Sequence, residues 1–518
     1  GGRSEMKKSR KALALGVTLL ALGTTACAAK DTKSEQSTAA TTESAASAGE
    51  STAAESKQAE DDKQAAAPEQ LRVSIESIRS TRERESGGET GMGSQDRFYE
   101  YPNWAMLPTV PDGATAALTE ALDAYADTQQ KALEAYAAAH QNSAEDDSLL
   151  NRYAGDVRLT RSDSNYLSFV RGTDSYSADA EGYTYDSKTG ERVLITQIVR
   201  DEKQFDSAVD QVTQETGMTE LAALAKEGFP ANKLVWALGN EGLELYLPKS
   251  DGNYVMYIRV VLSYESFPDL FTDRVKARPA QYAAVLVPNQ QAYIDGKRIH
   301  VSAPSGQSGS FTVEVDNKEH TFKKSEESGD LLSLVFVKTT EGDFLYCEFV
   351  GDIADDSQLV AVNMADMSEN TELGTPDLCT GFDLQRVTDP ATLFLNARLD
   401  TLSTLTASLP VSVGQGGKLE VQGSYQYLGV TELHTKQALT LSLVKNGKES
   451  GETVELPADT KLFFYAGDGK SYVDFRLEDD RVVRVHIASD ENGSDGSLWK
   501  VEGKYYDKDV FSGMRYAG

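Results

Sequence analysis

Short runs of alternating apolar and polar residues, separated by turn sequences, dominate the chain from about residue 289 onward. Ile294-Asp295-Gly296-Lys297 and Ala466-Gly467-Asp468-Gly469 are two of the turns, and Phe311–Val315 and Val482–His486 are two of the alternating runs. An apolar side chain at every second position places one face of a strand in a core, and Gly or Asp permits the reversal between strands. The sequence therefore predicts an all-β domain over residues 289–518, either a sandwich or a propeller-like array. No strict fixed-period repeat establishes a complete propeller.

Residues 71–288 show a different pattern, in which two helical segments are separated by strands. The first helix is expected after Pro111, with Asp112 as its cap, and the second over about Glu202–Glu215, continuing brokenly to Gly228. The apolar face of the first helix comprises Leu118, Leu122, Tyr125, Leu133 and Tyr136. Strands are predicted at Val157–Thr160, Tyr166–Arg171, Tyr183–Asp186, Val193–Val199, Trp236–Leu238, Leu243–Leu247 and Tyr254–Ser263. Without regular βαβ alternation, this order indicates an α+β domain built on an antiparallel sheet with two helices.

The first 70 residues predict an exported chain on a flexible tether. Basic residues between Lys7 and Lys11 precede an apolar run, Ala12–Leu22, and small residues follow it, which is the pattern of a signal peptide over residues 1–27. The run is too short to cross a membrane comfortably. Residues 28–70 contain no aromatic or large aliphatic side chain. Such a segment cannot bury enough apolar surface to fold, so we predict a disordered linker.

Cys27, directly after Ala26, is the predicted point of lipid attachment. The segment resembles the end of a bacterial lipoprotein signal, although Thr24 stands where that signal usually has Leu. The alternative is ordinary cleavage after Ala26, which would release a secreted protein. We therefore expect the chain at the extracellular face of the cell membrane, attached through an N-terminal lipid.

The net charge of −30 limits the classes of partner. Nucleic acids and anionic lipid surfaces are disfavoured, because contacts to phosphate need clustered Lys and Arg. A strongly acidic surface instead favours basic partners and raises their rate of encounter. No nucleic-acid partner is expected.

The segment Tyr183–Glu191 carries a resemblance to a known family. It is similar to a hairpin, Tyr-x-Phe-Asp-x-x-Thr-Gly-Lys, of the extracellular domain that the anti-sigma factor RsiV shares with the peptidoglycan deacetylase PdaC. The matching residues are Tyr183, Tyr185, Asp186, Thr189 and Gly190. Gly190 suits a strand reversal because glycine adopts positive φ without strain. The resemblance covers about residues 71–288, with a helix, strands, a second helix and an apolar strand pair in the family's order.

The resemblance implies a surface lipoprotein domain of a Gram-positive envelope. RsiV binds lysozyme, but no residue of that contact carries over to this chain. The family's Gly-Gly-Ala-His stretch is replaced here by Gly172–Tyr176, and no sigma-factor-binding segment or transmembrane helix is found, so an anti-sigma role is not implied. The remaining part resembles the tails of clostridial surface lipoproteins of unknown role.

No sequence pattern predicts a catalytic or metal centre. A Gly-x-Ser-x-Gly elbow is absent, and its nearest approach, Gly306–Gly309, is typical of a Gly/Ser-rich loop. The five histidines are scattered, without an i, i+4 pair to hold zinc. Oxygen-bearing residues alternate in Asp490–Gly496, but Asp495 stands where a calcium loop requires glycine. We predict no catalytic residues, no metal and no cofactor.

Aromatic side chains are the remaining candidates for binding, since stacked aromatics hold sugars or anchor protein interfaces, although most aromatics belong to a core. The candidates are Tyr99, Tyr101, Trp104, Tyr254 and Tyr257. Besides Cys27 the chain has two cysteines, Cys347 and Cys379, which could pair in an oxidising exterior. A buried free thiol at Cys347 is the equal alternative, because it lies in an apolar run.

These observations favour non-catalytic binding at the cell envelope, with a basic protein such as lysozyme or the wall glycan as ligand. One alternative is a structural or assembly component of an envelope complex. Another is a cell-wall hydrolase with dispersed catalytic residues, which would show a pocket with convergent carboxylates of displaced pKa.

Overall fold

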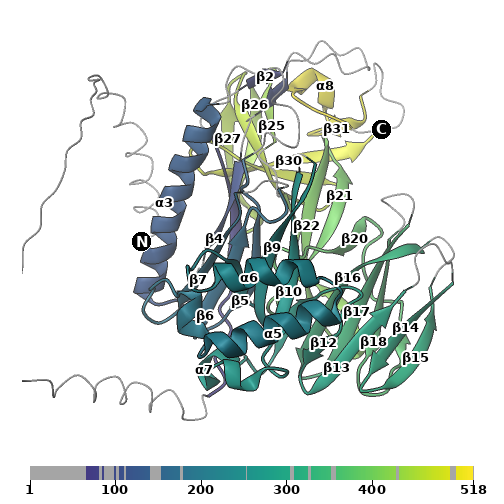
Figure 1. Cartoon of the computed structure of the whole chain (residues 1–518). Coiled ribbons are helices and arrows are strands. Elements are labelled where there is room, and N and C mark those ends of the chain that lie inside the picture. The colour runs from purple at the N-terminus through teal and green to yellow at the C-terminus, as the bar shows by residue number, and fades with distance from the viewer. Residues whose placement is uncertain are drawn as a thin grey trace, which may run out of the picture. The chain divides into compact units, whose positions relative to one another are not determined.

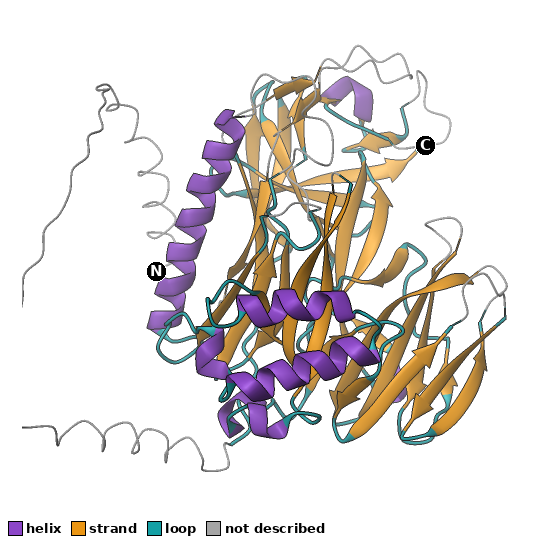
Figure 2. Cartoon of the chain, viewed as in Figure 1, coloured by secondary structure: helices purple, strands orange, loops and turns teal. Residues whose placement is uncertain are grey.

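Antiparallel sheets make up most of the chain, with a few helices beside them (Figure 2), so the β-rich prediction is confirmed. The signal peptide, Cys27, nearly all of the predicted linker, and Tyr101 lie outside the described residues. The structure, a computed structural model, describes residues 66–80, 84–86, 98–100, 104–109, 113–139, 153–175, 179–252, 254–303, 309–324, 328–351, 357–427, 431–490 and 497–516.

The described residues up to Ser263 form small antiparallel sheets. Strand β1 pairs with β4 and β2 with β3, and two three-stranded sheets have the orders β5-β6-β7 and β10-β9-β8. The strands are β1 (Ser74–Arg79), β2 (Arg84–Ser86), β3 (Phe98–Glu100), β4 (Trp104–Thr109), β5 (Val157–Ser162), β6 (Tyr166–Arg171), β7 (Glu181–Asp186), β8 (Val235–Leu238), β9 (Gly242–Asp251) and β10 (Tyr254–Ser263). The helices are α3 (Ala116–Ala139), α4 (Ile195–Ile198), α5 (Glu202–Glu215), η2 (Thr219–Leu221), α6 (Ala222–Gly228), η3 (Pro268–Leu270) and α7 (Asp273–Lys276).

Both predicted helices form. Helix α5 has the bounds that its apolar spacing predicts, and the Asp201 side chain caps it by accepting a hydrogen bond from the Gln204 N–H at 2.8 Å. The first turn of α3 is capped by Thr115, whose hydroxyl accepts from the Leu118 N–H at 3.1 Å. The predicted cap, Asp112, lies outside the described residues. Helices α5 and α6 lie across the sheet of β8, β9 and β10 (Figure 1).

The predicted strand Val193–Val199 is wrong, because most of this segment is the short helix α4. The Gln197 side chain accepts a hydrogen bond from the Leu194 N–H at 2.7 Å, which stabilises a helical first turn. The strand reversal before it does form, but its second arm is a single bridge, in which Arg192 pairs with Tyr185. The hydrogen bond of the Gln197 side chain therefore favours a helical turn more strongly than the β-branched residues of the segment favour a strand.

From Tyr282 onward the described residues are almost entirely β. One sheet has the order β11-β16-β17-β18-β19, a second has the order β12-β13-β14-β15, and a third contains the strands from β20 to β33. The strands are β11 (Tyr282–Leu286), β12 (Ala292–Ile294), β13 (Lys297–Ser302), β14 (Ser310–Val315), β15 (Lys318–Lys323), β16 (Ser328–Thr339), β17 (Gly342–Gly351), β18 (Ser357–Asn363), β19 (Glu369–Asn370), β20 (Cys379–Phe382), β21 (Leu393–Asp400), β22 (Thr404–Val413), β23 (Leu419–Val421), β24 (Tyr425–Tyr427), β25 (Glu432–Thr435), β26 (Leu439–Lys445), β27 (Lys448–Leu456), β28 (Lys461–Gly467), β29 (Tyr472–Arg476), β30 (Val482–Ser489), β31 (Trp499–Val501), β32 (Tyr505–Tyr506) and β33 (Phe511–Ser512). Two short helical turns, η4 (Gln415–Gly417) and α8 (Asp507–Val510), interrupt them.

The sheet of β11 and β16–β19 is buried on both faces. On β17, Phe344 and Tyr346 enter the core shared with the large sheet of β20–β33, whereas Leu345 and Cys347 enter the core shared with β12–β15. Neighbouring residues of a strand point to opposite faces, so one apolar run can serve two cores. The sheets of this part therefore pack face to face.

Hydrogen bonds join the described residues up to Ser263 to those from Tyr282 onward. The Leu159 N–H donates to the Gln385 carbonyl at 2.9 Å, and the Asn240 side chain donates to the Ala283 carbonyl at 2.8 Å. Strand β11, which precedes the boundary predicted at residue 288, pairs with β16, which follows that boundary. None of the helices in the described ranges combines the length and apolar character that a membrane crossing requires.

Candidate functional site

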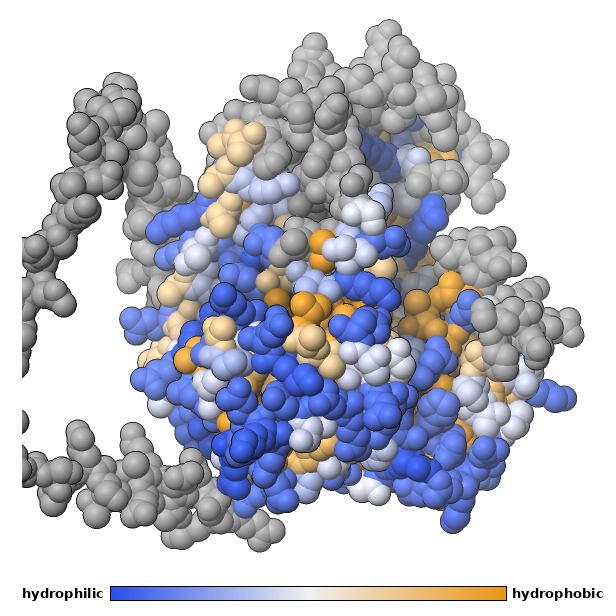
Figure 3. Space-filling view, viewed as in Figure 1, coloured by the Kyte–Doolittle hydropathy of each residue, from blue (hydrophilic) through white to orange (hydrophobic). Residues whose placement is uncertain are grey.

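A pocket rich in polar side chains lies between helix α5, strand β10 and the segment that follows β11. Its volume is about 390 Å³, which is within the range of small-molecule sites. It draws residues from both sides of position 288, and the face that carries α5 is covered mainly by hydrophilic residues (Figure 3). The lining residues are Gln211, Val212, Glu215, Thr216, Glu241, Val261, Ser263, Ser266, Phe267, Val287, Asn289, Gln290, Gln291, Ala292, Tyr293 and His300. We call it the junction pocket.

Helix α5 supplies one wall of the junction pocket. Phe205 and Val209 are fully buried in the core that α5 shares with β9 and β10. Their burial fixes the rotation of the helix, so that Gln211, Val212 and Glu215 line the pocket from its last two turns. The Gln211 side-chain amide donates to a Glu215 carboxylate oxygen at 2.9 Å, which holds the two side chains together.

Glu241 is the buried acid of the junction pocket. It lies in the turn between β8 and β9, is only 4% exposed, and accepts a hydrogen bond from the Tyr293 N–H at 3.2 Å. Burial raises the pKa of Glu241 to about 7, and the positive charges of Arg259 and Arg278 offset only part of this effect. Near neutral pH a large fraction of Glu241 is therefore protonated and able to donate a hydrogen bond.

The turn after β11 closes the opposite side of the pocket. Asn289 has a φ of 58°, which asparagine tolerates better than most residues. The Ser263 hydroxyl donates to the Tyr293 carbonyl at 2.8 Å. This hydrogen bond links β12 to the end of β10. This turn brings three consecutive amide side chains, those of residues 289–291, to the pocket.

Two residues that line the junction pocket each have a buried polar atom without a hydrogen-bond partner among the described residues, namely Ser266 Oγ and Gln291 Nε2. A buried donor without a partner is costly, and most proteins avoid it. Because neither atom has appreciable accessible surface, a ligand in the pocket cannot pair with either of them.

The composition of the pocket disfavours anionic ligands. Its described lining residues include two carboxyl groups, four side-chain amides and one histidine, and none of them is Lys or Arg. Amides and carboxylates hold ligands that carry hydroxyl and N–H groups, and Phe267 and Tyr293 add aromatic surface. In the described residues no group of three His, Cys, Asp or Glu side chains could hold a metal ion.

Of the aromatic residues predicted from the sequence, the two whose side chains are described, Tyr254 and Tyr257, do not share one surface. Tyr254 and Tyr257 lie on β10, but their spacing places them on opposite faces of the strand, and Tyr254 is 46% exposed. Tyr99 lies in β3 and Trp104 in β4, and Tyr101 lies outside the described residues.

Tyr257 lines a second pocket, of about 480 Å³, together with residues of α6 and β9. Burial raises the pKa of Tyr257, as it does for most tyrosines of this region. Among the described side chains that line this second pocket, none has a buried polar atom without a partner.

The family-like hairpin has a structural role in the described contacts. Tyr183 and Tyr185 are buried in the core beneath α3, and an Asp186 carboxylate oxygen accepts from the Lys188 and Thr189 N–H groups. Gly190 has a φ of 69°, and a Cβ there would lie against the carbonyl of Ala117 in α3. Glycine is therefore required where the reversal meets the helix.

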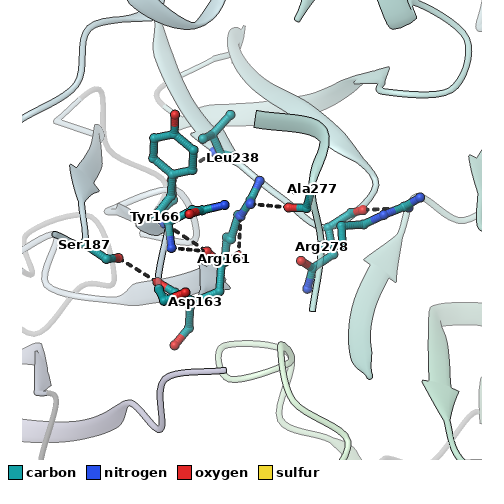
Figure 4. A network of polar contacts seen from close by, with 12 residues as sticks. Arg161, Asp163, Tyr166, Ser187, Leu238, Ala277 and Arg278 are labelled. Atoms are coloured by element: carbon teal, nitrogen blue, oxygen red, sulfur yellow. Dashed lines mark hydrogen bonds and ion pairs between the residues drawn. The ribbon is translucent and has the colours of Figure 1, made fainter. Parts of the chain in front are cut away.

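A buried polar network next to this hairpin joins three segments (Figure 4). The guanidinium of Arg161 is fully buried, pairs with Asp163 at 2.6 Å and donates to the Val275 and Ala277 carbonyls at 2.6 Å. The Ser187 hydroxyl donates to the Asp163 carbonyl at 2.7 Å. Because the Arg161 guanidinium and the Asp163 carboxylate both have protein partners, this network stabilises the fold and leaves little capacity for a ligand.

The two cysteines of the folded part are free thiols, so the predicted pairing is not present. Cys347 points into the core between β12–β15 and the middle sheet, whereas Cys379 packs against the core on the other side of that sheet. Burial raises the pKa of the Cys347 thiol far above its ordinary value and that of Cys379 to about 11. The alternative of a buried free thiol at Cys347 is confirmed.

The residues of the junction pocket were not predicted as a site from the sequence. Its three main contributors, Gln211–Thr216, Val261–Phe267 and Val287–Tyr293, are separated by tens of residues and share no motif. The polar run Asn289-Gln290-Gln291 after an apolar strand was the one local signal. No protein-family model matches this chain, and no curated protein matches it.

Proposed function

We propose that this chain is a non-catalytic binding protein of the cell envelope that holds wall glycan in the junction pocket. The observation that carries the proposal is the lining of that pocket, in which amides, carboxyl groups and two aromatic rings surround a space of about 390 Å³ without any Lys or Arg. A glycan presents hydroxyl and amide groups on a ring with apolar faces, and this lining complements both.

The proposal includes the cellular location of the chain and its domain organisation. Residues 1–27 act as a signal peptide that leaves Cys27 lipidated, and residues 28–70 act as the tether. Residues 71–288 form an α+β domain of the RsiV and PdaC type, and residues 289–518 form a sandwich-like β domain. The net charge of −30 supports a ligand that is not anionic.

Retention on purified peptidoglycan tests the proposal. Gln211 is exposed on α5 and lines the pocket, so Gln211→Trp should fill the opening and reduce the retained fraction several-fold. The matched control is Gln204→Trp, an exposed position two turns earlier on the same helix and outside the pocket, which should bind like the wild type. Equal retention of both variants would contradict a role of the pocket.

Lysozyme is the rival ligand, because an acidic surface attracts basic proteins. If lysozyme is retained at low salt and peptidoglycan is not, and if Gln211→Trp has no effect, then the acidic surface rather than the pocket is the binding site. Retention that disappears between 50 and 200 mM salt, values on the order of those that screen surface charge, would support that rival.

One observation favours hydrolysis as a second candidate function. Glu241, with a pKa raised to about 7, and the exposed Glu215 line the same pocket. Glycosidases use a pair of carboxyl groups that flank the bond they cleave, one of them with a raised pKa. Against this, Glu241 is almost completely buried and is already hydrogen-bonded to the Tyr293 N–H. Release of new reducing ends from peptidoglycan, absent in Glu241→Gln, would establish the hydrolase.

A further inference from the structure

Strand β10 is a long edge strand that lacks the features by which proteins usually protect an edge. Among the described strands it pairs only with β9, at the end of the sheet order β10-β9-β8. Its ten residues match β9 without a register shift. Proteins usually protect an edge with proline, lysine, a bulge or a very short strand, because the open N–H and C=O groups of an edge invite another chain. Tyr254–Ser263 has none of these features.

Three other edge strands of the described sheets are protected in these ways. Strand β15 begins with Lys318 and ends with Lys323. Strand β27 begins with Lys448 and has a register shift in its pairing with β26. Strand β20 has four residues and a register shift in its pairing with β21. Strand β10 differs from all three, because nothing in its sequence or register discourages the addition of a further strand.

The pairing with β9 shows which backbone groups of β10 point outward. Tyr257 lies opposite Pro248, which has no N–H, so these two residues form one of the non-hydrogen-bonded pairs of the ladder. Such pairs alternate with hydrogen-bonded pairs along an antiparallel ladder. The N–H and C=O groups of Val255, Tyr257 and Arg259 therefore point away from β9. Beyond the ladder with β9, no hydrogen bond among the described residues involves these backbone groups.

Apolar side chains flank this outer edge. Tyr254 and Met256 are 46% and 38% exposed, on the face of the sheet that continues into the core under α5. Val255 and Tyr257 are half-buried on the opposite face. An added strand would therefore cover apolar surface on both faces of the sheet. The part of β10 that lines the junction pocket begins at Val261, so Tyr254–Arg259 lies outside that pocket.

The charges favour a basic partner over a second copy of this chain. The two basic residues nearest the edge are already paired, Lys249 with Glu220 at 3.8 Å and Arg259 with Glu244 at 3.7 Å. Asp251, which directly precedes the turn into β10, is exposed. A second copy would bring another net charge of −30, which is repelled, whereas a segment that carries lysine or arginine is attracted.

We propose that the outer edge of β10 binds an extended segment of a basic protein, which adds to the sheet β10-β9-β8 as a further strand. Backbone hydrogen bonds to Val255, Tyr257 and Arg259 hold the segment, and its alternating apolar side chains contact Tyr254 and Met256. This binding goes beyond the glycan proposed for the junction pocket and uses a different surface.

Fluorescence anisotropy of a labelled peptide with the full chain tests the inference. The probe is acetyl-Lys-Val-Lys-Val-Lys-Val-Lys-amide, which is basic and has an apolar side chain at every second position. The matched control is the same peptide with methyl groups on three central backbone nitrogens, which keeps the charge but prevents a complete ladder. We expect the control to bind about tenfold more weakly. Equal affinity would show that charge alone attracts the peptide and would overturn the inference.

A change in the edge itself gives a second test. Val255→Pro removes an outward N–H but no hydrogen bond to β9, which an edge strand tolerates. It should weaken binding of the probe about tenfold. Val255→Thr keeps the N–H and the β-branched shape, and it should bind within about twofold of the wild type. Wild-type affinity in both variants would contradict the proposed strand addition.

Hydrogen exchange of the wild-type chain, read at each amide, gives a test that needs no variant. The peptide should slow exchange at the outward amides of Val255, Tyr257 and Arg259. The amides of Met256 and Ile258, which point toward β9, should change little. If the three outward amides exchange at the same rate with and without peptide, the edge is not the binding site.

A second copy is the rival occupant of the edge. If the wild type sediments as a dimer, Val255→Pro as a monomer, and the peptide does not bind, then the inference of a basic partner is wrong. The failure of this inference also differs from the failure of the proposed function. Gln211→Trp should reduce retention on peptidoglycan and leave peptide binding unchanged, whereas Val255→Pro should do the reverse.

Discussion

The burial of Glu241 predicts a pH-dependent cost to stability that Glu241→Gln should remove. The pKa of this carboxyl group rises from 4.5 to about 7 on folding, and each tenfold change in proton affinity corresponds to about 1.4 kcal/mol. The folded state therefore loses about 3 kcal/mol of stability relative to the unfolded state as this one group ionises.

The direction of the effect follows from the raised pKa. Below about pH 4.5 the carboxyl group is protonated in both the folded and the unfolded state, and its contribution is fully present. As the pH rises toward 7, the unfolded chain ionises freely while the folded chain resists, so stability falls. Above about pH 7 both states are ionised and the loss is complete.

Urea unfolding at pH 5 and at pH 8 measures this loss. Gln has the shape of Glu but does not titrate, so the free energy of unfolding of Glu241→Gln minus that of the wild type should increase by about 2 to 3 kcal/mol between the two pH values. The control is Gln211→Leu, because Gln211 lines the same pocket, is exposed to water and does not titrate. Its difference from the wild type should be the same at both pH values. An equal difference at both values for Glu241→Gln would refute the burial argument.

Three further predictions test other contacts. Gly190→Ala should cost about 2 kcal/mol or more, because its φ of 69° is strained for alanine and the new Cβ would meet the Ala117 carbonyl; an unchanged urea midpoint would contradict this. Arg161→Met should cost about 3 to 5 kcal/mol, since it leaves a buried carboxylate unpaired, and thermal melting as high as the wild type's would show that the network adds nothing. A thiol reagent should label Cys379 slowly in the native protein and Cys347 only after unfolding; peptide mapping by mass spectrometry decides, and a disulfide-linked peptide pair would be the contrary result.

The elements with a strong period were predictable from the sequence. Helix α5 has the predicted bounds because its apolar residues follow the helical period and Asp201 marks its start. Strand β10 has the predicted bounds because its run is rich in β-branched and aromatic residues. The segment Val193–Val199 was mispredicted because its short apolar run suits either structure, and the Gln197 side chain then favoured a helical turn.

The junction pocket could not be predicted, because no single segment contains it. Glu241 would be expected to be exposed, since it lies in a tight turn in which the Gly239 N–H donates to the Gly242 carbonyl at 2.8 Å. The segment around Tyr293, some fifty residues later, packs against that turn and contributes to the burial of Glu241. Such burial depends on how the two parts of the chain meet, and periodicity within either part carries no information about it.

The position of Glu241 also bears on whether the pocket is functional. A glutamine at this position could accept the same hydrogen bond from the Tyr293 N–H without the ionisation cost of about 3 kcal/mol. A carboxyl group that lowers stability at neutral pH while lining a polar pocket is the kind of residue expected where function outweighs stability. If the pocket only filled space between the two parts of the chain, Glu241→Gln would gain stability at pH 8 and lose no binding. If Glu241 contributes to glycan binding, the same change should raise stability and lower affinity together.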